Sequence, residues 1–162
     1  RGSTAKLARL EKEDQQLGFL TGDWNVQIVN YDKGKEVGKF DGKVMSEFND
    51  NNNILTSKYV NSLGETVNQR ILVYDAIDKT FDMAYIDPVE PLGINLSKVK
   101  IKKSGDNSFE LMEDYTNREG EKKSAKHEIV KESDGKLMWT IYEQGADKNW
   151  EKAAVWTYNK SM

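Results

Sequence analysis

Three side chains in the C-terminal half of the sequence could together carry out acid–base chemistry. They are Glu113, His127 and Glu143, and His127 is the only histidine in the chain. An imidazole changes its charge near neutral pH and a carboxylate can accept or donate a proton, so each could act as a general acid or base. Such chemistry requires the fold to place all three side chains in one cavity.

His127 also allows two other interpretations. An imidazole that faces the interior of the protein could be the proximal ligand of a haem iron, a role that histidine fills in many haem proteins. Alternatively, His127 is a hydrogen-bonded residue of a sheet with no chemical role. The lysine-rich sequence of residues 122–131 favours this last interpretation, because it is typical of a solvated strand.

Other catalytic and metal-binding motifs are missing from the sequence. There is no cysteine, which excludes disulfides, thiolate nucleophiles and cysteine-ligated metals. Residues 50–53 lack the glycine and the distal glutamate of a calcium loop, and there is neither a glycine-rich phosphate loop nor a Gly-x-Ser-x-Gly motif. We therefore predict no metal site, and no cofactor unless His127 binds haem.

Composition excludes several classes of partner. The 162 residues suit one domain, and the formal net charge of -3 gives no positive field to attract nucleic acid. No apolar stretch approaches the roughly 18 residues that a membrane-spanning helix needs, so we predict no membrane insertion. The chain starts with Arg1 instead of Met, and we expect an exported protein whose signal peptide was removed, with a cytoplasmic location as the alternative. The oligomeric state stays open.

The elements that would position these side chains are short strands. From Trp24 to Lys160, apolar and polar residues alternate in about ten runs separated by Gly, Asn and Asp turns. A long antiparallel meander exposes two edges unless it closes, so the pattern predicts a single up-and-down antiparallel β-barrel of about ten strands. Residues 5–20 form the one helical candidate, which divides the chain into a tail with a capping helix (1–17) and a barrel domain (18–162).

Most strands show which face turns inward, but the third (54–61) and the last (150–160) are ambiguous, and the sixth changes phase. In the fourth strand we assign Val67, Gln69, Ile71 and Val73 to the interior and Arg70 to the outside, because a charged side chain prefers water. In the sixth strand Ile94 and Leu96 lie on one face and Val99 and Ile101 on the other. A β-bulge near Ser97 would bring both pairs inward.

A barrel of this kind can hold a small molecule. The adaptable and aromatic side chains on the inner face are the predicted ligand-binding residues, with a few polar groups among them. These residues are Tyr59, Gln69, Met83, Tyr85, Phe109, His127 and Trp139. In a narrower barrel the same residues would form an ordinary packed core.

Three segments resemble the lipocalin-like barrels of the calycin superfamily. The stretch Phe19-Leu20-Thr21-Gly22-Asp23-Trp24 is similar to their helix-to-strand entry with Gly-x-Trp, and residues 74–87 resemble the central hairpin of a bacterial lipocalin-like family of unknown function. Residues 153–160 match the closing strand of that family. Lys160 takes the place of the arginine that covers the tryptophan in lipocalins. The resemblance implies a barrel that carries a hydrophobic ligand.

These observations lead to three hypotheses about function. The first is a protein that binds a small hydrophobic molecule inside the barrel without catalysis. The second is a barrel enzyme of the isomerase, cyclase or hydratase type that uses Glu113, His127 or Glu143. The third is a haem protein with His127 as the ligand. The proline-containing loop at residues 87–92 is the expected mouth of the barrel.

Overall fold

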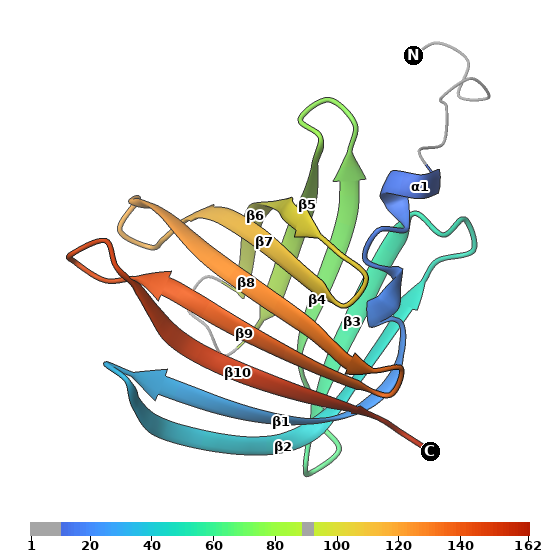
Figure 1. Ribbon diagram of the computed structural model, residues 1–162, viewed down its shortest axis with the longest axis horizontal. Helices are drawn as coiled ribbons and strands as arrows, with labels where there is room; N and C mark the ends of the chain where they lie inside the picture. Colours follow the sequence, from blue (N-terminus) through green and yellow to red (C-terminus); the bar gives the residue numbers. More distant parts are fainter. Residues whose placement is uncertain (1–10, 89–92) are drawn as a thin grey trace.

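The computed structural model describes residues 11–88 and 93–162, and in these residues ten antiparallel strands close into one barrel (Figure 1). Each strand pairs with its neighbours in sequence, and the first strand pairs with the last. This confirms the predicted all-β, up-and-down barrel. The strands are β1 (Gly22–Asp32), β2 (Lys35–Phe48), β3 (Ile54–Asn61), β4 (Thr66–Asp75), β5 (Thr80–Asp87), β6 (Gly93–Ser104), β7 (Ser108–Thr116), β8 (Lys122–Ser133), β9 (Lys136–Gln144) and β10 (Trp150–Lys160).

The connections alternate between the two ends of the barrel. The β1–β2, β3–β4, β7–β8 and β9–β10 turns lie at one end, which we call the mouth. The N-terminal segment, the C-terminus and the β2–β3, β4–β5, β6–β7 and β8–β9 turns lie at the opposite end. Residues 89–92 of the loop expected to form the mouth lie outside the described residues, but β5 ends and β6 begins at the mouth end. In Figure 1 the β1–β2 and β9–β10 turns point to the left, while α1 (Glu11–Asp14) and the C-terminus lie on the right.

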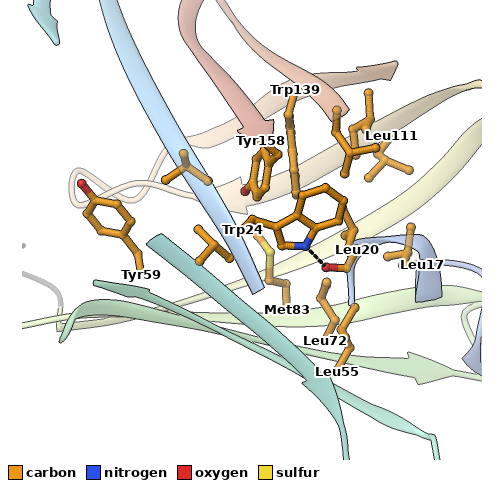
Figure 2. Close-up of a cluster of buried hydrophobic side chains, with 14 of the residues drawn as sticks. Leu17, Leu20, Trp24, Leu55, Tyr59, Leu72, Met83, Leu111, Trp139 and Tyr158 are labelled. Carbon is orange, nitrogen blue, oxygen red and sulfur yellow. Dashed lines mark hydrogen bonds between the residues drawn. The ribbon is translucent and has the colours of Figure 1, made fainter. Parts of the chain in front are cut away.

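A tightly packed plug closes the end opposite the mouth. Leu17, Leu20 and Trp24 are almost completely buried, and the Trp24 indole nitrogen donates a hydrogen bond to the Leu20 carbonyl at 2.9 Å (Figure 2). The Lys160 ammonium lies 4.3 Å from the centre of the Trp24 ring and donates to the Thr21 carbonyl. Trp24 is therefore part of the floor of the barrel.

Gly22 is required for this arrangement. Its φ of +125° lies outside the range that residues with a side chain readily adopt, and a Cβ atom there would come within 2.7 Å of the Lys160 nitrogen. The glycine therefore lets the Lys160 side chain cross over Trp24. The Gly-x-Trp step and the terminal lysine form one structural unit.

The predicted N-terminal helix is wrong in its extent. Within the described residues, α1 ends at Asp14, a turn follows, and a short 3-10 helix, η2 (Gly18–Leu20), leads into β1. Residues 5–10 of the predicted helix lie outside the described residues. Leu17 and Leu20 are buried inside the barrel. The chain therefore turns inward after Asp14 instead of continuing as one helix to residue 20.

The predicted orientation of β4 is wrong for Gln69, Ile71 and Val73, although Val67 packs against the core as predicted. Leu72 is buried and pairs with the buried residues Leu55 and Met83, so Leu72 and Arg70 face inward. Gln69 lies on the opposite face, and Val73 is 40% exposed. Both faces of this strand carry apolar residues, so alternation alone could not choose between them, and the charge of Arg70 suggested the wrong one.

The bulge predicted near Ser97 is absent. β5 and β6 pair without interruption from Val99 to Gly93, and the irregularity in β6 lies between Ile101 and Lys103 instead. As a result, Val99 faces the core while Leu96 is 71% exposed on the outer surface. The two apolar pairs of this strand therefore stay on opposite faces of the sheet.

Candidate functional site

Two of the three predicted acid–base residues meet inside the barrel. Leu111 of β7 lies opposite His127 of β8, so Glu113 stands one inward position along β7, and its Oε1 lies 2.9 Å from the His127 Nε2. From β9, the Trp139 indole nitrogen lies 2.9 Å from the other imidazole nitrogen, Nδ1. All three residues are more than 90% buried, and we call them the buried cluster.

The chemistry of the donors fixes the proton positions in the buried cluster. An indole N–H can only donate, so Nδ1 of His127 accepts its hydrogen bond. The neutral imidazole then carries its proton on Nε2 and donates it to the Glu113 carboxylate. Trp139 thus holds His127 in one tautomer. The hydrogen bond from His127 then offsets part of the desolvation free energy of the buried Glu113 carboxylate.

Glu113 is held in its charged form. Burial raises the pKa of its carboxyl, but the hydrogen bond and the electrostatic attraction from His127, together with Ser97 and the charge of Arg70, lower it more strongly. The result is a pKa below the ordinary value of 4.5. Ser97 Oγ is near enough to contribute, although it makes no hydrogen bond of good geometry in the described residues.

This lowered pKa predicts a dependence of stability on pH. Because the folded protein binds the Glu113 proton more weakly than the unfolded chain, the pair contributes stability above pH 4.5 and loses it as the pH falls through the lower, folded-state pKa. Urea unfolding between pH 3 and pH 7, the range spanning the ordinary carboxyl pKa, should show a smaller acid loss for Glu113→Gln than for the wild type. Asp75 and Asp147 also have lowered pKa values, so the difference between the two proteins isolates Glu113. Equal acid slopes would contradict the assignment.

Glu143, the third candidate, is separated from the other two. It lies opposite Ala125, close to the mouth, and its side chain is exposed. Glu143 acts on the interior through Tyr115: burial raises the pKa of this tyrosine, and the charges of Glu143 and Glu113 raise it further. The structure therefore brings Glu113 and His127 together and leaves Glu143 at the rim.

The mouth contains a cavity of about 670 Å³. Its walls come from β1 to β5, β9 and β10 and combine aromatic rings with asparagine amides and two carboxylates. The lining residues are Ile28, Asn30, Phe40, Tyr59, Asn61, Val67, Asn68, Tyr85, Asp87, Ile141, Glu143, Ala153, Ala154 and Trp156. We call this space the mouth cavity. A volume of this size suits a small organic molecule.

The predicted ligand-binding residues are divided between four places. Tyr59 and Tyr85 line the mouth cavity. Met83, His127 and Trp139 lie deeper, around a space of about 10 Å³, which is scarcely enough for one water molecule. Phe109 stacks on Phe19, with 4.1 Å between ring centres, and helps to close the far end. Gln69 points out of the barrel, as described above.

Sequence analysis missed two interior residues beside the mouth cavity. Trp156 lines the cavity and packs at right angles to Tyr59, with 5.6 Å between ring centres. Apolar residues on both faces of β10 concealed its orientation. Arg70 lies inside the barrel, 4.9 Å from the centre of the Trp139 ring and 5.7 Å from that of Tyr85. The sequence gives one indication that Arg70 faces inward: Leu72, two residues along on the same face of the strand, is apolar.

Haem does not fit this interior. Both ring nitrogens of His127 already have hydrogen-bond partners, so coordination would require breaking one of these contacts. The space beside the imidazole, about 10 Å³, cannot hold a porphyrin ring. Among the described residues, no group of three or more His, Cys, Asp or Glu side chains is arranged to hold a metal ion.

A second depression lies on the outside of the barrel. It has a volume of about 770 Å³, crosses β4 to β8, and includes Ile71, Ala84 and Leu96 in its lining. We call it the outer groove. The mouth cavity is the stronger candidate site because the barrel wall surrounds it and its aromatic rings converge, whereas the outer groove lies on the exposed side of the sheet.

Similarity to known proteins is limited to overall shape. No protein-family model matches the sequence, and no curated protein matches it. The crystal structure of Rv2717c from M. tuberculosis has 12% sequence identity and a TM-score of 0.57, with 93% of this chain and 98% of that chain covered. This similarity shows a shared barrel fold.

Two further solved structures are less similar in shape. EF1p2_mFAP2b bound to DFHBI has 11% identity and a TM-score of 0.41, covering 92% of this chain and 99% of that chain. A redesigned β-barrel, b11L5F_LGL, has 9% identity and a TM-score of 0.38, covering 91% and 96%. Within residues 11–88 and 93–162, no helix has the length and apolar character that a membrane crossing requires.

Proposed function

We propose that this protein binds a small, mostly apolar molecule in the mouth cavity and does not transform it chemically. The mouth cavity carries the proposal: about 670 Å³ of space is bounded by Tyr59, Tyr85 and Trp156, while the opposite end is filled by the plug around Trp24. Aromatic walls with a few amides are typical of sites that recognise a small organic ligand.

The closed barrel, the Gly22-Asp23-Trp24 entry and the Lys160 contact with the Trp24 ring support a relation to lipocalin-like proteins. We propose this relation on these features. The lysine takes the place that an arginine has in the lipocalin pattern, and it makes the same type of cation–π contact.

The enzyme hypothesis is weaker because of where the buried cluster lies. Glu113 and His127 are paired to each other and are covered by Trp139 and Met83, so a substrate in the mouth cavity would not reach them without rearrangement. Glu143 does line the cavity, but it stands there without the histidine. These contacts favour a structural role for the pair.

Probe binding tests the proposed site. N-phenyl-1-naphthylamine, a neutral dye that fluoresces in apolar surroundings, should bind the wild type at one saturable site. Ala153→Phe fills the mouth cavity and should weaken binding about tenfold or more, since the added ring occupies the ligand's space. Ala84→Phe makes the same substitution in the outer groove and should leave binding unchanged.

The opposite pattern would contradict the proposal. If Ala84→Phe weakened binding and Ala153→Phe did not, the outer groove would be the site. Absence of saturable binding by this dye and by lipid or pigment extracts from the native source would remove the carrier function altogether. Thermal unfolding of each variant must show that it folds.

A further inference from the structure

Arg70 is an unusual residue to find inside a barrel. On the inner face of β4 it stands between Asn68, which lines the mouth cavity, and the buried Leu72. It lies opposite Ser57 on β3 and Tyr85 on β5. Its guanidinium is placed near the Tyr85 and Trp139 rings, so it lies at the base of the mouth cavity.

The guanidinium lacks the partner that a buried charge normally requires. Among the described residues, no carboxylate lies within ion-pair distance of Arg70, and its Nε is buried without a hydrogen-bond partner. The charge of Arg70 lowers the pKa of Glu113, but the two groups form no ion pair, and the Glu113 Oε1 lies 2.9 Å from the His127 Nε2. Leaving a charged donor unmatched in the interior is unfavourable, so its retention calls for an explanation.

The remaining exposure of Arg70 must face the inside of the barrel. Arg70 is only partly buried although it points inward. It lies among the residues around the 10 Å³ space beside His127 and is not itself part of the mouth-cavity lining. Tyr85 lies between Arg70 and the mouth cavity: the centre of its ring is 5.7 Å from the guanidinium carbon, and the residue also lines the cavity. A ligand that extends past Tyr85 from the floor of the cavity would meet this cation.

We propose that the ligand of the mouth cavity is an apolar or aromatic monoanion, such as a carboxylate, whose charged group binds Arg70 while its body packs against Tyr59, Tyr85 and Trp156. The inference rests on the proposed function and adds the chemical class of the ligand. The planar guanidinium matches the two oxygens of a carboxylate. Arg70 lies deeper than the cavity lining, so the anionic end of the ligand should enter first. The carboxylates of Asp87 and Glu143 stand at the rim, where water weakens their repulsion of that group.

Two dyes with the same aromatic body separate this inference from the proposed function. 8-Anilinonaphthalene-1-sulfonate is an anion, and N-phenyl-1-naphthylamine lacks the sulfonate. We expect the wild type to bind the anion more tightly, and Arg70→Met to weaken anion binding about tenfold to a hundredfold while leaving the neutral dye unchanged. Arg70→Lys should retain part of the preference, because it keeps the charge and loses the planar geometry. Arg118→Met, in the exposed β7–β8 turn, is the matched control and should bind both dyes normally.

Stability of the unliganded protein gives a second readout. If Arg70 serves a ligand, Arg70→Met should unfold at nearly the same temperature as the wild type, because removing the unpaired Nε offsets the loss of the ring contacts and of the charge near Glu113. A lowered midpoint together with unchanged anion binding would assign Arg70 a structural role and overturn the inference. Binding of the neutral dye with no preference for the anion would overturn it while leaving the proposed function intact. Binding of neither dye would overturn both.

Discussion

Replacing Trp24 with alanine is expected to destabilise the protein by about 3–5 kcal/mol, the usual range for removing a large buried aromatic side chain. Only 1% of this residue is exposed, and its ring contacts Tyr158 edge-on, with 5.8 Å between ring centres. The substitution also removes the hydrogen bond to the Leu20 carbonyl and the ring beneath Lys160. Urea unfolding measures the loss.

A matched tryptophan on the outer face provides the control. Trp150 is only partly buried, and the Lys126 ammonium lies 5.4 Å from the centre of its ring. Trp150→Ala should therefore lower the free energy of unfolding by about 1 kcal/mol. Trp24→Phe keeps most of the ring and should fall between the two alanine variants. If Trp24→Ala were no more destabilising than Trp150→Ala, the plug would not be the structural floor of the barrel.

Replacing His127 with leucine should cost about 3–5 kcal/mol, because the change leaves the buried Glu113 carboxylate without its donor. Glu113→Leu alone should cost less, about 1–3 kcal/mol, since the neutral imidazole loses one acceptor. The double variant Glu113→Leu/His127→Leu should be more stable than His127→Leu, because it no longer buries the Glu113 carboxylate without its donor. The free energies of unfolding of the four proteins form a double-mutant cycle.

The result of this cycle tests the role of the pair directly. Strong coupling, with the double variant recovering stability, is expected of a buried pair that supports the fold. Additive losses would show that the 2.9 Å contact between Glu113 and His127 contributes little. Ligand binding at the mouth should persist in the double variant, because neither residue lines the mouth cavity.

Most inward-facing positions could be predicted because alternation is strong where one face of a strand is polar. In β8, Ala125, His127 and Ile129 are buried between Lys126 and Glu128, as the sequence indicates. The same argument places Glu113 correctly on β7. It fails for β4 and β6, where both faces carry apolar residues and the outer face of the sheet exposes Val73 and Leu96. There the register with neighbouring strands decides the orientation.

The candidate site was predicted only in part, for a related reason. Tyr59 and Tyr85 were identified because aromatic residues on an inner face suit a cavity wall, and both do line the mouth cavity. Whether an inner position lies in a cavity or in a packed core depends on its height along the barrel. Met83 and Trp139 share their inward orientation, yet they lie among the packed side chains between the cavity and the plug.

By itself, the sequence determines that this chain forms an antiparallel barrel, because the period-two pattern and the Gly, Asn and Asp turns act locally on each strand. It also determines the plug, through the Gly22-Asp23-Trp24 step. Only the tertiary structure decides that Arg70 faces inward and that both ring nitrogens of His127 form hydrogen bonds, with Glu113 and Trp139. These facts depend on which strands lie opposite one another and at what height, and such long-range pairings leave no mark within a single strand.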